Sequence, residues 1–151
     1  MKDGKLLLSE LMQGIYDKRL KDIYVDEHLV EGQKKRYGKA IERYEEIFGG
    51  GQIEIYSTPG RSEVGGNHTD HQYGRVLATS INLDAIAVVG FNEENCIRIL
   101  SEGYEMITVD LSDLSIQEKE KETTAALIRG VAAGLDKLSF ATKQGFNAYV
   151  T

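Results

Sequence analysis

PGRSEVGGNHTDHQYG, residues 59–74, contains four glycines, two histidines, two acidic residues and one arginine, with no hydrophobic period. So many polar groups would need partners inside a core, and an apolar core offers few. Glycine permits positive φ angles and close approach of the backbone to a ligand. Arg, His and Asp side chains bind hydroxyl and phosphate groups. The stretch therefore predicts a polar binding loop between structured elements.

The residues on both sides of this loop have strand patterns. Apolar and polar residues alternate over 53–58, and Pro59-Gly60 is expected to end that strand. After the loop, residues 76–81 and 85–89 form two apolar, strand-like runs. Residues 97–101 and 105–109 indicate a hairpin around Gly103, and the alternation over 146–150 predicts a last strand.

Helical patterns occupy the first fifty residues and a later segment. Leu8, Leu11, Met12 and Ile15 recur at helical spacing, with Ser9-Glu10 as a possible start. A second helix carries an apolar stripe and should end at the glycines 49–51; the stripe is Tyr37, Ile41, Tyr44, Ile47 and Phe48.

The polar segment 110–122 is expected to be exposed, its charged run 118–122 included. A long helix should follow from about Thr123, with one apolar face made of Leu127, Ile128, Val131, Leu135 and Leu138. The order of elements predicts an α+β fold, in which N-terminal helices precede a mixed β-sheet covered by helices on one face.

Composition narrows the function classes. The 151 residues suit one domain, and the net charge of −6 argues against a nucleic-acid or anionic-membrane partner, while leaving room for one local phosphate site. A single cysteine, Cys96, excludes an internal disulfide framework and favours a reducing compartment; we expect it to be buried and inert in a strand. No apolar run is long enough for a signal peptide or a membrane span, so a cytoplasmic protein is expected.

The loop and its flanks resemble the galactokinase family, within the superfamily of homoserine and mevalonate kinases. The family signature reads roughly G-R-x-N-x-I-G-E-H-T-D-Y-x-x-G-x-V-L-P-x-A-I, and residues 60–81 read GRSEVGGNHTDHQYGRVLATSI. Residues 126–131, ALIRGV, resemble the family's N-Y-V-K-G-V helix. Residues 145–150, GFNAYV, resemble the strand before its phosphate-binding loop. The resemblance implies a ribosomal protein S5 domain 2-like fold, with a helical prelude over 1–51 and a sheet over 52–151 that carries a sugar-binding loop at 59–74.

The resemblance implies the N-terminal portion of a sugar kinase that transfers the γ-phosphoryl group of Mg-ATP to the anomeric hydroxyl of galactose or a related sugar. By position in the motif, Arg61 is expected to be catalytic, to bind the substrate and to lie beside the transferred group. Asp70 is expected to hold two adjacent sugar hydroxyls, and Asn67 and His68 to line the far end of the sugar. An ionised carboxylate accepts several hydrogen bonds, and arginine stabilises charge on a transferring phosphoryl group.

Three positions depart from the family pattern. Asn67 stands where the family has Glu, Glu63 where it has Asn, and His71 where it has an aromatic residue. An amide both donates and accepts hydrogen bonds, whereas a carboxylate only accepts. The identity of the sugar therefore stays open.

The family's G-L-S-S-S-A loop and its following catalytic Asp are not in the sequence. We expect ATP and Mg²⁺ to bind outside this chain, which would then be an N-terminal fragment, inactive alone, with no metal site of its own. Two alternatives remain. One is a non-catalytic sugar sensor of the same family, and the other is a metal-dependent hydrolase that uses His68, Asp70 and His71, with His28 as the one further histidine.

Overall fold

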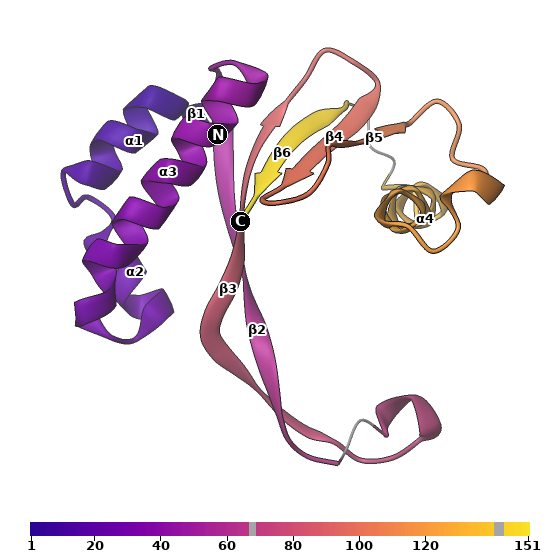
Figure 1. Ribbon diagram of the computed structural model, residues 1–151, viewed down its shortest axis with the longest axis horizontal. Helices are drawn as coiled ribbons and strands as arrows, with labels where there is room; N and C mark the ends of the chain where they lie inside the picture. The colour runs from indigo at the N-terminus through magenta and orange to yellow at the C-terminus, as the bar shows by residue number, and fades with distance from the viewer. Residues whose placement is uncertain (67–68, 141–143) are drawn as a thin grey trace.

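In the computed structural model, which describes residues 1–66, 69–140 and 144–151, the strands form one mixed sheet (Figure 1). The order across the sheet is β1-β2-β3-β6-β4-β5. β4 and β6 are parallel and the other neighbours are antiparallel. The strands are β1 Lys2–Asp3, β2 Gln52–Gly65, β3 Leu77–Phe91, β4 Cys96–Ser101, β5 Ile107–Asp110 and β6 Phe146–Val150. The α+β class is confirmed, as are the β4–β5 hairpin and the buried position of Cys96.

Three helices, α1 Gly4–Met12, α2 Asp17–Tyr24 and α3 Val30–Phe48, cover one face of the sheet, with the 3-10 turn η1 Glu27–Leu29 before α3. The predicted stripe of α3 is confirmed. Its Tyr37, Ile41 and Tyr44 are buried in a cluster with Ile53, Ile86, Val88 and Tyr149 of the sheet. Gly49 ends α3 with a φ of 80°. The expected start of the first helix at Ser9 is wrong, because the Asp3 side chain caps α1 by accepting a hydrogen bond from the Leu6 N–H at 3.1 Å.

The last helix, α4 Thr124–Lys137, requires a correction, because the helices do not all cover one face. α4 packs on the opposite face at the β4–β6 side, where Ile128 and Ala132 meet Ile97 and Phe146. Only Ile128 of the predicted apolar face joins this cluster. Leu127, Val131, Leu135 and Leu138 are exposed. Within the described residues, no helix is both long and apolar enough to cross a membrane.

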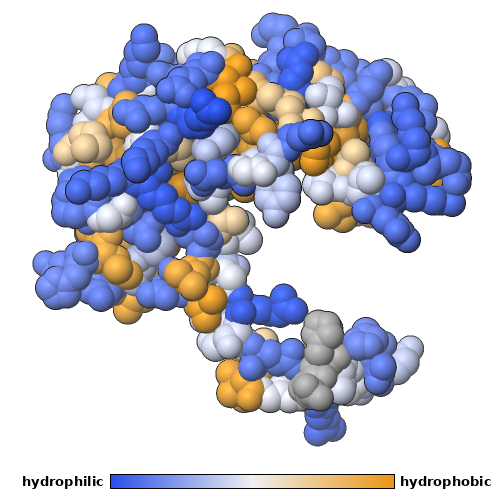
Figure 2. Space-filling view, in the orientation of Figure 1, coloured by the Kyte–Doolittle hydropathy of each residue, from blue (hydrophilic) through white to orange (hydrophobic). Residues whose placement is uncertain are grey.

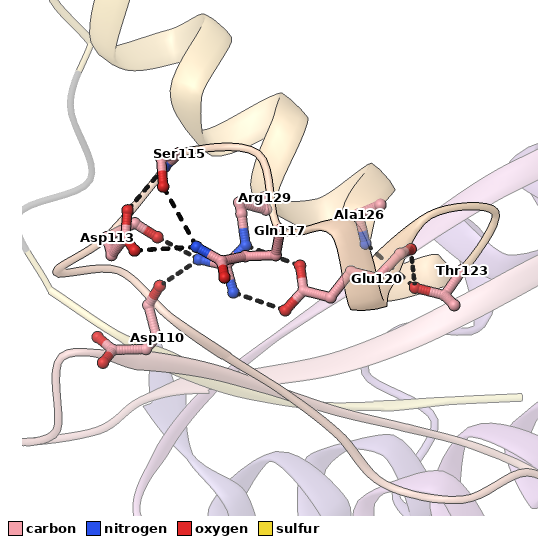
Figure 3. A network of polar contacts seen from close by, with 8 residues as sticks. All are labelled: Asp110, Asp113, Ser115, Gln117, Glu120, Thr123, Ala126 and Arg129. Atoms are coloured by element: carbon pink, nitrogen blue, oxygen red, sulfur yellow. Dashed lines mark hydrogen bonds and ion pairs between the residues drawn. The ribbon is translucent and has the colours of Figure 1, made fainter.

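The segment expected to be wholly exposed, residues 110–122, is fastened to α4 by Arg129 (Figure 3). The Arg129 guanidinium donates two hydrogen bonds of 2.8 Å to the Glu120 carboxylate. It also donates to the main-chain carbonyls of Asp110 and Asp113. Glu120 lies in the 3-10 turn η3 Glu118–Glu120, and its side chain is only 13% exposed. The expectation that the whole charged run 118–122 is solvated is wrong at this residue, because a buried guanidinium needs an anionic partner.

The largest departure from expectation lies at residues 59–84. Pro59-Gly60 does not end the strand: β2 continues to Gly65, and the two apolar runs after the loop form one strand, β3. The two strands therefore extend into the expected loop from both sides, β2 as far as Gly65 and β3 from Leu77 onward. Pro59 is tolerated because the pairing shifts register between Pro59 and Arg61, where the missing N–H of proline breaks no regular ladder. Residues 59–66 and 69–84 form a two-stranded projection, called the arm below, that stands away from the body (Figure 1).

Candidate functional site

Arg61 lies on the arm, in β2, where its Cα pairs with that of Ser80 in β3. Its side chain is exposed. Within the part of the chain that the structure describes, no hydrogen bond or ion pair engages its guanidinium group, unlike those of Arg36, Arg98 and Arg129. Arg61 is thus a permanently charged donor available to a ligand.

The other three predicted site residues are Asn67, His68 and Asp70, which follow Gly66 in the sequence. Asn67 and His68 lie outside the described residues. Asp70 begins the 3-10 turn η2 Asp70–Gln72, and only its backbone is described. The pairing of β2 with β3 as far as Gly65 and Leu77 brings Arg61 and the η2 turn onto the same arm. The roles assigned to these four residues stay predictions.

The described part of the tip is closed by hydrogen bonds around Thr69. The N–H groups of Gln72 and Gly74 donate to the Thr69 carbonyl at 3.0 and 2.8 Å. The Thr69 hydroxyl donates to the Gly66 carbonyl at 2.8 Å. Both glycines are needed here. Gly66 has a φ of 108°, a Cβ on it would lie 2.4 Å from the Arg75 carbonyl oxygen, and one on Gly74 would lie 2.0 Å from the Thr69 hydroxyl.

A buried polar cluster at the base of the arm is centred on Asp84, whose side chain is 3% exposed. Its carboxylate accepts hydrogen bonds from the Arg36 guanidinium at 2.5 Å, the Ser57 hydroxyl at 2.5 Å and the Tyr24 hydroxyl at 2.7 Å. Burial alone would raise the pKa of Asp84, but the bonds from Ser57, Arg36 and Tyr24 outweigh it and hold the pKa below its usual value. Sequence reasoning missed this cluster, although a single acidic residue between two apolar runs was a visible signal.

A groove of about 1030 Å³ lies beside this cluster, between helices α1 and α2 and the base of the arm. Tyr24, Ser57 and Asp84 are among its polar lining residues, and Leu11, Ile23 and Ile53 are among its apolar ones. Arg61 and the η2 turn do not line it. A different hollow lies on the other side of the arm. Figure 2 shows it as an open indentation between the arm and the part of the body that contains α4.

No group of three or more His, Cys, Asp or Glu side chains suited to a metal ion occurs among the described residues. His68, one member of the alternative metal set, lies outside them.

A family model described as "Galactokinase galactose-binding signature" matches residues 42–91, from the end of α3 through the arm to the last residue of β3. The galactokinase of Limosilactobacillus reuteri (strain DSM 20016) is 28% identical over 116 residues, which cover 73% of this chain and 30% of that protein. The galactokinase of Lacticaseibacillus casei (strain BL23) is 31% identical over 110 residues, which cover 71% of this chain and 28% of that protein. This chain therefore spans about 30% of the length of such curated relatives.

Two of the solved structures that share the fold are kinases. The structure of Lactococcus lactis galactokinase complexed with galactose matches with a TM-score of 0.63 and 24% identity, over 72% of this chain and 29% of that one. Methanococcus jannaschii mevalonate kinase matches with a TM-score of 0.53 and 18% identity, over 67% of this chain and 32% of that one. In both cases the aligned part is under a third of the solved chain.

Proposed function

Because the chain belongs to the galactokinase family, whose N-terminal portion it matches, we propose that it forms the sugar-binding part of a kinase that phosphorylates galactose or a closely related sugar. One observation carries the proposal: the galactose-binding signature covers both strands of the arm and its tip, where Arg61 and Asp70 lie. The exposure of the arm supports it, because a ligand can reach Arg61 without displacing another side chain.

The two residues have complementary chemistry in this proposal. The Asp70 carboxylate accepts hydrogen bonds from two neighbouring hydroxyls of the sugar, which fixes the sugar's orientation. The Arg61 guanidinium lies beside the anomeric hydroxyl and stabilises the negative charge on the transferring phosphoryl group. Asn67 and His68 contact the opposite end of the sugar. With an amide at position 67 where the family has a carboxylate, the preferred sugar is galactose or one that differs from it at that end.

ATP and Mg²⁺ are the expected phosphoryl donor and its metal, and we assign no residue of this chain to either. The sequence has no Gly-rich Ser loop of the kind that cradles ATP phosphates through backbone N–H groups. Since phosphoryl transfer depends on positioning and electrostatics, the 151 residues alone should bind sugar without phosphorylating it. A cytoplasmic location is in keeping with the single cysteine and with a need for ATP.

Calorimetric titration of D-galactose into the purified chain tests the assignment of Asp70. The Asp70→Ala variant should lose binding, because the two hydroxyls lose their acceptor. Asp136→Ala is the matched control, since Asp136 is an exposed aspartate of α4. Equal galactose affinity in all three proteins would contradict the assignment.

The Asn67→Glu variant tests the specificity of the site. Restoring the family carboxylate should shift the preference between galactose and other hexoses towards galactose. An unchanged preference would show that specificity is set elsewhere.

The departures at Glu63 and Asn67 also favour a second candidate, a sugar sensor of the same family that binds without catalysis. Glu63 would place a negative charge near the ATP phosphates, which a sensor tolerates more easily than a kinase. The candidates differ in one measurement on a protein of the relatives' full length: ATP-dependent sugar phosphorylation supports the kinase and excludes the sensor.

A further inference from the structure

We propose that Asp84 is a positioning residue that fixes the direction of the arm relative to the body, and through it the placement of Arg61 and the η2 turn. The effect on sugar affinity rests on the function proposed above. The effect on the arm itself does not.

Asp84 lies where the arm loses its contacts with the sheet. The last Cα pair between β3 and β6 is Ala87 with Val150, and the flanking Ile86 and Thr151 exchange hydrogen bonds of 2.9 and 3.0 Å. Before Ile86 along the chain, the strand neighbour of β3 is β2 alone. Asp84 is thus two residues beyond the edge of the body.

The Asp84 cluster replaces these lost sheet contacts with bonds to other elements. Tyr24 donates to the carboxylate from α2 and Arg36 from α3, while Ser57 donates from β2. Arg36 also donates to the main-chain carbonyl of Asp84 at 2.8 Å and to that of Thr151, after β6, at 3.1 Å. One carboxylate therefore joins the arm to two helices and to β2 in the body, and Arg36 extends the link to the main chain at Thr151.

We expect the cluster to be rigid for two physical reasons. The Asp84 carboxylate is 3% exposed, so water does not compete for its bonds. Hydrogen bonds to an ionised group are shorter, stronger and more directional than those between neutral groups. The Tyr24 hydroxyl is itself held at 2.9 Å from that of Tyr37 in α3, which restricts the donor as well.

Because the arm is long, a small change in its angle at the base moves the tip by several ångströms. Residues 77–84 of β3 extend roughly 25 Å at the usual rise of a strand, so a change of about 10° at Asp84 would move the tip by about 4 Å. Substrate-positioning groups lose much of their effect when displaced by about 1 Å. Next to the Pro59–Asp84 pair, the register of the β2–β3 pairing shifts before Arg61. Strand pairing at this irregular point cannot by itself fix the angle between the arm and the body.

Distances between spin labels test the positioning directly. The labels are placed through Tyr73→Cys, at the exposed tip, and Lys39→Cys, on the exposed side of α3, in a Cys96→Ala background. The parent should give one narrow distance distribution, and Asp84→Asn should broaden it or shift it by several ångströms. Glu120→Gln, which weakens a carboxylate–arginine pair beside α4 instead, is the matched control and should leave the distribution unchanged.

A narrow, unshifted distribution in folded Asp84→Asn protein would overturn the proposal. If that variant does not fold, Tyr24→Phe and Ser57→Ala each remove one hydroxyl donor and little volume. A parental distribution in both of these would equally overturn the proposal.

Titration with D-galactose separates this proposal from the proposed function. Asp84→Asn should weaken galactose binding about tenfold, and Glu120→Gln should not change it. If the parent binds no galactose while Asp84→Asn still alters the distances, the proposed function fails and the positioning role stands. If the parent binds galactose and Asp84→Asn changes neither affinity nor distances, the positioning role fails and the proposed function stands.

Discussion

Arg129 shows how a single residue can organise a segment that has little regular structure of its own. Its guanidinium group, about nine-tenths buried, binds the Glu120 carboxylate and two carbonyls of the segment 110–120. The hydrogen bonds from Arg129 hold the pKa of Glu120 below its ordinary value. The ionised carboxylate is therefore favoured in the folded state.

This pKa shift predicts a pH dependence of stability. A carboxyl whose pKa is lowered on folding contributes stability that is fully present above its unfolded pKa, about 4.3. That contribution is lost as the pH falls through the folded value. The Glu120→Gln variant, which cannot ionise, should be less stable than the parent at pH 7 and should lose less stability between pH 5 and pH 3. Urea unfolding followed by circular dichroism at these pH values measures both effects. Parallel stability curves for the two proteins would contradict this account.

Gly66 is the residue at the tip whose backbone most clearly requires glycine. Alanine there would combine a φ of 108° with a Cβ placed 2.4 Å from the Arg75 carbonyl oxygen. We expect Gly66→Ala to open the turn around Thr69, so the Gly74 amide, which donates to Thr69, should exchange with solvent about tenfold faster. Hydrogen exchange followed by NMR checks this. Gly50→Ala is the control, because nothing lies within 4 Å of a Cβ there, and equal exchange rates in both variants would contradict the prediction.

At the scale of elements, α3 and the arm differ in how far the sequence could predict them. The stripe of α3 was predictable because helical periodicity is local, and the glycine after Phe48 marks its end. The arm was not, because Pro59-Gly60 and Gly65-Gly66 read locally as strand breakers. Only the long-range pairing of β2 with β3, with its register shifts, shows that the strand continues past Pro59.

The packing of α3 predicts that the same Ile→Ala substitution has very different effects on the free energy of unfolding at two positions. Ile41 of α3 is 0% exposed and Ile116 is 85% exposed. Ile41→Ala should lower the free energy of unfolding by about 2–5 kcal/mol, because it removes buried methyl groups and leaves a cavity. Ile116→Ala should change it by less than about 0.5 kcal/mol. Chemical denaturation of both variants provides the comparison, and a similar loss in the two would show that α3 does not form the core described here.

For the whole molecule, the motif in residues 60–81 indicated the family, and the α+β class followed from the order of elements. Asp84 stood out in the sequence, but its partners could not be predicted, because the cluster joins residues up to 115 positions apart, as between Arg36 and Thr151. The packing of α4 on the second face was missed for a similar reason. Its most periodic apolar residues, such as Leu127 and Val131, are exposed, and the buried residues of α4 are Ala132 and the polar Arg129.

The length of the chain, compared with that of its relatives, predicts that it has no kinase activity on its own. The chain corresponds to about 30% of the length of the curated galactokinases it matches. Incubated with ATP, Mg²⁺ and galactose, it should form ADP no faster than a sugar-free control. Sustained, galactose-dependent ADP formation in a coupled assay would contradict the proposed division between sugar binding and ATP binding.

The central claim is that sugar binds on the arm, and an NMR titration of the ¹⁵N-labelled chain with D-galactose tests it most directly. The account predicts saturable shifts of amide signals on the arm, including those of Arg61, Thr69 and Gly74, and their loss in Asp70→Ala. If galactose leaves these signals unmoved while the protein is folded, or moves only signals of the body, the arm is not the sugar site.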